Sequence, residues 1–117
     1  MSEHTLQYQI IQYLLVNKIT VIDLDIMSGL QYFKHTDSRR FTFINHHKKM
    51  GYIKGQPDFL IILPEKRNVY IEMKIKKRKQ SKEQKEFEIN IKSKGHEYYV
   101  WNSFEDCIKF VKDIKKL

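Results

Sequence analysis

Two acidic residues and a lysine interrupt a segment that otherwise has the composition of a buried β-hairpin. In residues 55–79, GQPDFLIILPEKRNVYIEMKIKKRK, Asp58 precedes an apolar run, and Glu72 and Lys74 alternate with apolar residues in the next one. Side chains two residues apart on a strand project to the same face, so Glu72 and Lys74 stand together. A reversal of the chain at residues 64–68 then brings Asp58 opposite them.

Such an arrangement suits a divalent cation. Two carboxylates so close repel each other and raise each other's pKa unless a cation lies between them. Oxygen ligands of this kind bind Mg²⁺ or Mn²⁺. Lys74 would then stand where it can steady an attacking water or the charge of a developing phosphorane, as metal-assisted phosphodiester hydrolysis requires.

A plainer interpretation of the same residues stays open. Glu72 and Lys74 could lie on the solvent face of an edge strand, with Asp58 in a turn after Pro57. The E-x-K pattern arises easily in a lysine-rich chain, and it recurs at residues 83–85, where a helix would turn the two side chains apart. The Pro-Asp that opens the preceding strand, and the lysine cluster that follows, favour a metal site at the first match.

The segments around the hairpin predict an α/β domain. Apolar spacing predicts helices and strands in the order α-β-α-β-β-α-β-α, over residues 3–17, 19–27, 38–51, 58–63, 69–75, 81–95, 96–101 and 103–117. This order predicts one domain, residues 1–117, with a mixed central sheet flanked by helices. In the second helix, which Gly51 ends, we expect Phe41, Ile44 and Met50 to face inward.

Composition narrows the class of partner. The chain carries 22 Lys and Arg against 14 Asp and Glu, a formal net charge of +8, and such a surface attracts polyanions, of which nucleic acid is the commonest in a cell. A merely soluble basic protein is the alternative.

No apolar run approaches the roughly 20 residues of a membrane helix, so we expect no membrane partner. A lone Cys107 and the absence of a signal peptide predict a reducing, cytoplasmic compartment.

The hairpin and its flanks resemble a known family. MGYIKGQPDFLII, residues 50–62, followed by VYIEMKIKKRKQSKEQKEF, residues 69–87, resembles the core of the virus-type replication-repair nuclease (VRR-NUC) family of the PD-(D/E)xK superfamily. The shared motifs are Met-Gly, G-x-P-D, E-x-K and S-x-x-Q, and the start of the chain is similar to the family's first helix. The resemblance implies a restriction-endonuclease-like fold and leaves a phage or viral origin open.

Residue by residue, the resemblance implies a metal-dependent catalytic site. Asp58, Glu72, Lys74 and Gln84 would be catalytic, and the metal ligands would be Glu3, Asp58, Glu72 and the backbone carbonyl of Met73. Two of these assignments have alternatives, and the ligand set has two rivals. Gln84 could serve only the capping box that begins at Ser81. Glu3 is favoured at a helix start in any case. Asp23 and Asp25 could be rival ligands, although solvated strand positions suit them better.

The function implied is a Mg²⁺- or Mn²⁺-dependent DNA endonuclease. The side chains expected to grip the DNA backbone are Arg39, Arg40, Lys48, Lys49, Lys54, Lys76, Lys77, Arg78 and Lys79. Backbone contacts carry no sequence information, so we expect recognition of shape. Stand-alone members of the family resemble Holliday-junction resolvases, which implies a homodimer that acts on branched DNA, joined through the first helix or residues 26–35. A non-catalytic nucleic-acid-binding module, a protein-interaction partner and a sequence-specific restriction-type nuclease are the alternatives.

Overall fold

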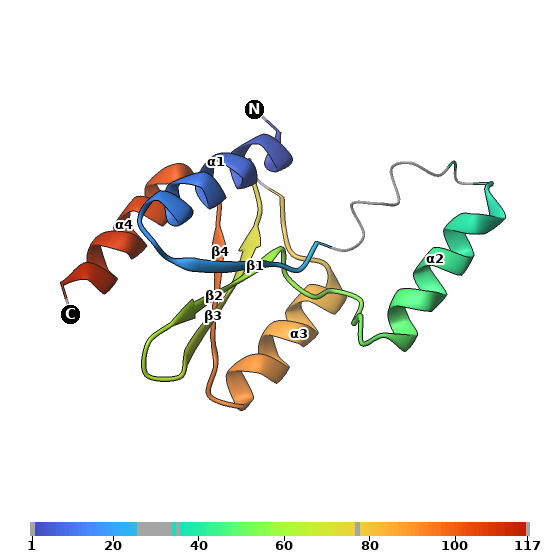
Figure 1. Cartoon of the computed structure of the whole chain (residues 1–117). Helices are drawn as coiled ribbons and strands as arrows, with labels where there is room; N and C mark the ends of the chain where they lie inside the picture. Colours follow the sequence, from blue (N-terminus) through green and yellow to red (C-terminus); the bar gives the residue numbers. More distant parts are fainter. Residues whose placement is uncertain (1, 26–33, 35, 77, 117) are drawn as a thin grey trace.

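The computed structural model describes residues 2–25, 34, 36–76 and 78–116 (Figure 1). Within them the elements follow the predicted order: α1 (Glu3–Val16), β1 (Thr20–Asp23), α2 (Ser38–Lys49), β2 (Phe59–Leu63), β3 (Arg67–Met73), α3 (Lys82–Ser93), β4 (Glu97–Trp101) and α4 (Phe104–Lys115). β1 is shorter than the strand predicted over 19–27, part of which falls outside the described residues. No described helix has the length and apolar character needed to cross a membrane.

The four strands form one mixed sheet in the order β1-β2-β3-β4. β2 pairs antiparallel with β1 and with β3, whereas β3 and β4 are parallel. A parallel pair needs a crossover, and α3 supplies it between β3 and β4. The predicted α/β class and mixed central sheet are confirmed.

The main hydrophobic core lies between one sheet face and the helices α1 and α4, which lie side by side (Figure 1). In the β2–β3 ladder Phe59 faces Ile71 and Ile61 faces Val69, and all four side chains are fully buried. Met73 continues the same face, as the strict alternation of residues 69–75 predicts. These five apolar side chains orient β3, so that the side chain of Glu72 must lie on the opposite face.

α3 covers part of the opposite face of the sheet. Phe87 and Ile91 from α3 form a second buried cluster with Tyr98 of β4, and Tyr70 of β3 packs against it. The rings of Tyr70 and Phe87 meet edge to face, with centroids 5.8 Å apart. Tyr70 and Glu72 share this face, and the first turn of α3 lines the same cavity as Glu72.

The prediction that Phe41, Ile44 and Met50 of the second helix face inward is wrong. Phe41 is 70% exposed and Met50 73% exposed, Ile44 is half-buried, and α2 contains no fully buried residue. Phe41 and Met50 are nine residues apart. At 100° per residue they point to opposite sides of the helix, so they cannot share one apolar stripe. The predicted end of the helix is right: Gly51 follows the C-cap with a φ of +102°, in the left-handed region.

Candidate active site

Asp58 is fixed by the strands on both sides of it. Its backbone N–H donates to the carbonyl of Ile71 at 3.1 Å, and its carbonyl accepts from the N–H of Leu24 at 2.9 Å. Its side-chain Oδ2 accepts from the N–H of Met73 at 2.7 Å. The β2–β3 register, extended by one residue, places Asp58 opposite Glu72, as the hairpin predicts. Asp58 lies one residue before β2, and hydrogen bonds to Leu24, Ile71 and Met73 position its carboxylate.

Glu72 is the one charged side chain that is buried among the described residues, with 2% of its surface exposed. Its Oε1 is buried and has no hydrogen-bond partner in the part of the chain that the structure describes. Burial raises the pKa of Glu72 to about 9, and the hydrogen bond and the charge of Asp58 add to this effect. The charge of Lys74 works in the opposite direction, and Glu3 contributes a smaller increase. Without a cation the carboxyl pair retains a proton at neutral pH.

Lys74 extends the sheet beyond the last residue of β3. Its backbone N–H donates to the carbonyl of Trp101 at 2.9 Å, which continues the β3–β4 pairing by one residue. Its side chain is half-buried, and its charge lowers the pKa of Glu72, so the ammonium lies within electrostatic range of that carboxylate. The structure therefore brings Asp58, Glu72 and Lys74 to one end of the β3 strand.

A cavity of about 310 Å³ opens beside the two carboxylates. The end of β1, the loop before β2, Glu72 and the first turn of α3 line it, with Leu24, Asp25, Tyr52, Lys54, Gly55, Gln56, Pro57, Asp58, Glu72, Ser81, Glu83 and Gln84. A larger cavity of about 970 Å³ lies at the other end of the sheet, near the β2–β3 turn, and none of the predicted catalytic side chains lines it. The size of a cavity alone would thus have pointed away from the acidic pair.

Gln84 takes part in the cap of α3 and also lines the cavity. Its Oε1 accepts from the N–H of Ser81 at 2.8 Å, and its own N–H donates to the Ser81 Oγ at 3.2 Å, so the capping box is complete. The amide nitrogen of the side chain is not needed for the capping box. The capping and catalytic interpretations of Gln84 are therefore compatible, and its catalytic role stays a prediction.

Gly55 lets the loop before β2 rest directly on α3. A Cβ at this position would lie 2.4 Å from the backbone carbonyl carbon of Glu83, and the φ of Gly55 is +91°. In the same loop the Gln56 Nε2 donates to the carbonyl of Leu24 at 2.7 Å. The loop is therefore held between β1 and α3, and this packing builds one wall of the cavity.

Gly55→Ala is expected to lower the free energy of unfolding by about 3 kcal/mol or more, because the new methyl group clashes with backbone and the φ is left-handed. Gly95→Ala is the matched control, since Gly95 has a φ of +85° but nothing within 4 Å of its Cβ position. The control should cost only about 1 kcal/mol. Urea unfolding of the two variants measures the difference, and equal losses would show that the loop does not pack on α3 in this way.

Glu3 lies near the site but is held by another partner. The Arg78 guanidinium donates to the Glu3 carboxylate in an ion pair that joins the start of α1 to the segment after β3. Within residues 2–25, 34, 36–76 and 78–116 the structure gathers no three His, Cys, Asp or Glu side chains that could hold a metal together. Glu3 and the carbonyl of Met73 therefore stay predicted ligands.

Asp25 is a cavity residue that the sequence interpretation underestimated. It lies beyond the end of β1, where its N–H donates to the Asp23 Oδ1 at 2.8 Å, and it lines the same cavity as Asp58 and Glu72. Asp23 itself is exposed. The D-x-D pattern at residues 23–25 was the only indication in the sequence. Residues two apart on a strand share one face, so the pattern predicts the same environment for both, and it does not show that the strand ends between them.

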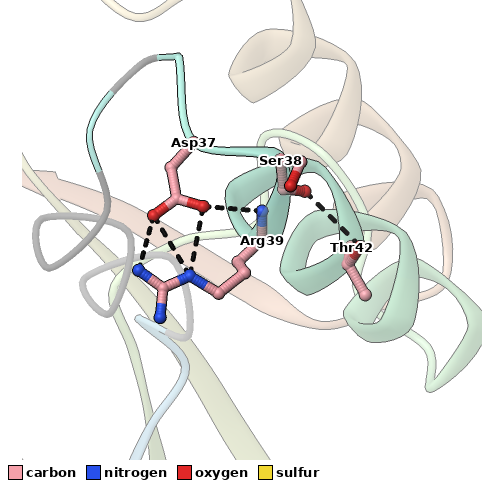
Figure 2. Close-up of polar contacts among 4 residues, drawn as sticks. All are labelled: Asp37, Ser38, Arg39 and Thr42. Carbon is pink, nitrogen blue, oxygen red and sulfur yellow. Dashed lines mark hydrogen bonds and ion pairs between the residues drawn. The ribbon is translucent and has the colours of Figure 1, made fainter.

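The predicted DNA-gripping residues that the structure describes come from three segments: α2, the loop before β2 and the segment after β3. Lys54 lines the cavity and pairs with Glu83 at 3.4 Å. Arg39 pairs with Asp37 at 2.7 Å at the start of α2, where the Asp37 carboxylate also caps the helix (Figure 2). The exposed residues of the set are Arg39, Lys48, Lys49, Lys54, Lys76, Arg78 and Lys79, whereas Arg40 is half-buried and Lys77 lies outside the described residues.

Comparison with known proteins rests on the fold. No family model matches the sequence, and no curated protein matches it. A solved structure described as a VRR_NUC domain superposes with a TM-score of 0.62 and 19% sequence identity, and the match covers 94% of each chain. The chain has the fold of a VRR_NUC domain. The predicted VRR-NUC architecture is confirmed, and in this fold Asp58, Glu72 and Lys74 occupy adjacent ends of the two central strands.

Proposed function

We propose that this protein is a Mg²⁺- or Mn²⁺-dependent DNA endonuclease, with Asp58 and Glu72 as the carboxylates that hold the ion. The observation that carries the proposal is the buried Glu72 Oε1, which has no hydrogen-bond partner within the described residues, on a side chain that interacts with a second carboxylate, Asp58. A buried carboxylate without compensation is costly, and a divalent cation removes that cost for both acids at once. The description of the structural neighbour as a VRR_NUC domain supports a nuclease.

Each residue of the site would have a defined task. Asp58 and Glu72 would bind the ion together with the Met73 carbonyl, and Glu3 would join them when it leaves Arg78. A bound Mg²⁺ or Mn²⁺ supplies Lewis acidity at the phosphoryl group and lowers the pKa of water. Lys74 orients the attacking water and stabilises the negative charge that develops on the phosphoryl oxygens.

The substrate that suits this surface best is branched DNA. With a net charge of +8, the chain can contact phosphates through its exposed lysines and arginines, of which Lys54 lines the cavity, and such contacts are independent of sequence. A homodimer would present one active site to each strand of a four-way junction. The exposed Tyr8, Leu15 and Val16 of α1, at 62%, 49% and 79% exposure, offer an apolar surface for such a dimer.

A cleavage assay tests the proposal. Labelled four-way junctions, flaps, linear duplexes and single strands are incubated with Mg²⁺, Mn²⁺ or EDTA. We expect metal-dependent cleavage that favours junctions and ignores sequence, and a loss of about 10²-fold or more in Lys74→Ala. Lys85→Ala is the matched control, because Lys85 belongs to the second E-x-K match but lies exposed on α3.

Each contrary outcome points to a different alternative. DNA binding that depends on salt, without cleavage of any substrate in either metal, would identify a non-catalytic binding module. Absence of both binding and cleavage would favour a protein-interaction partner. Cleavage at one sequence regardless of branching would identify a restriction-type nuclease. Equal rates for Lys74→Ala and Lys85→Ala would remove the lysine from the mechanism.

A further inference from the structure

The outward face of α2 combines an exposed aromatic ring with positive charge. Phe41 is 70% exposed, and the exposed Lys48 and Lys49 follow it at the i+7 and i+8 positions of the same helix face, where Asn45 at i+4 is half-buried. The 12-residue helix holds four lysines and arginines and no acidic residue. This surface differs from the other side of α2, where Phe43 and His47 are half-buried and their rings meet at 4.3 Å.

α2 stands apart from the sheet and from the other helices (Figure 1). A helix of this length is marginal in water on its own, and packing normally stabilises it. α2 buries no side chain fully, so packing within the described structure does not cover its outward face, and a partner can bind there. Charge selects the class of partner: a second copy of the chain would bring another net +8 to this basic face, whereas nucleic acid complements it.

The chain also keeps α2 close to the acidic pair. Seven residues lie between Met50, the C-cap of α2, and Asp58, so the two are at most ~29 Å apart even when the chain is fully extended. The first part of this segment is anchored, because the Tyr52 N–H donates to the carbonyl of His47 at 2.8 Å. Tyr52 and Lys54 then line the cavity itself. A DNA duplex bound at the cavity would therefore reach α2 within about one turn of its double helix.

We infer that Phe41 stacks on an unpaired base of the DNA, while Lys48 and Lys49 contact the adjacent phosphates. Aromatic side chains stack on every type of base, but the bases of an intact duplex are already stacked on one another. Phe41 would therefore select DNA that exposes a base, at a branch point, a fork or a frayed end. This inference rests on the proposed function, and it names the DNA feature that would make the enzyme structure-selective.

The test is a binding measurement in EDTA, so that it depends neither on the metal nor on cleavage. One probe is an intact duplex, and the other is a fork of the same sequence with 2-aminopurine as the unpaired base at the branch. We expect Phe41→Ala to weaken fork binding on the order of tenfold and to abolish the quenching of 2-aminopurine, with less than about a twofold effect on the duplex. Phe41→Trp should retain both binding and quenching.

Matched variants separate stacking from other effects. Ile89→Ala removes an equally exposed apolar side chain, 70% exposed on α3, and should leave both probes unaffected. Lys48→Ala should weaken the binding of both probes alike and reduce the salt dependence by about one phosphate contact. Circular dichroism shows that each variant keeps its helix content.

Three results would overturn the inference. The first is fork binding and quenching by Phe41→Ala at the level of the wild type. The second is an equal loss of affinity for the duplex and the fork. The third is dissociation of a dimer by Phe41→Ala in sedimentation, which would assign the ring to a contact between two copies. A wild-type protein that cleaves no DNA would contradict the proposed function while leaving this binding measurement interpretable.

Discussion

Asp58→Asn is expected to abolish metal-dependent DNA cleavage, with a loss of about 10³-fold or more in the single-turnover rate. The substitution keeps the shape of the side chain, and the amide oxygen can still accept the hydrogen bond that the Met73 N–H donates to Asp58 at 2.7 Å. What it removes is the ability of one of the two neighbouring carboxyl groups to carry the negative charge that would hold the ion. Loss of activity with an unchanged fold would therefore report the loss of the charge.

Asp23→Asn is the control for this experiment. Asp23 is the last residue of β1, in the strand next to Asp58, but its side chain is exposed. We expect the control to cleave within about twofold of the wild type, since neutralising one surface charge has a small effect. If Asp58→Asn also cleaved like the wild type in Mg²⁺, Asp58 would not be a ligand of a catalytic ion.

In the absence of divalent ions, the free energy of unfolding is expected to fall as the pH rises from about 5 to about 9. The pKa of Glu72 is raised from 4.5 to about 9 in the folded protein, chiefly by burial, so the folded state binds a proton that the unfolded state has released. The stability that this bound proton contributes is complete at pH values below the pKa of Glu72 in the unfolded state. It is lost as the pH rises through the pKa of Glu72 in the folded state. The raised pKa of Glu72 corresponds to a contribution of about 6 kcal/mol at most.

Urea unfolding of Glu72→Gln at several pH values measures this effect. The amide cannot titrate, so the variant should lose most of the pH dependence between these limits and should be more stable than the wild type at pH 8 in EDTA. Mg²⁺ should stabilise the wild type at pH 8 and leave Glu72→Gln almost unchanged. The same pH dependence in both proteins would show that Glu72 is not the group responsible.

The part of the site that the sequence predicts correctly is local. Asp58 and Glu72 belong to one hairpin, and alternation along residues 69–75 decides which face each side chain takes, so their opposition follows from the register alone. The eight elements follow from apolar spacing in the same way. In each case the prediction depends only on residues within one short segment of the sequence.

The features that the sequence does not predict depend on contacts between distant segments. The close approach of Gly55 to α3 and the ion pair between Glu3 and Arg78 join elements whose relative positions are set by the whole fold. The orientation of α2 is a different case. Its apolar residues are scattered around the helix, so their presence could not indicate that Phe41 would remain exposed.

The central claim is that Asp58 and Glu72 together bind a divalent cation. Electron paramagnetic resonance of Mn²⁺ added to the wild type, Asp58→Asn, Glu72→Gln and Asp23→Asn counts the bound ion directly and needs no DNA. We predict Mn²⁺ binding in the wild type and in Asp23→Asn, and its loss in the other two variants. Undiminished Mn²⁺ binding in Asp58→Asn and Glu72→Gln, or no bound Mn²⁺ in the wild type, would contradict the claim.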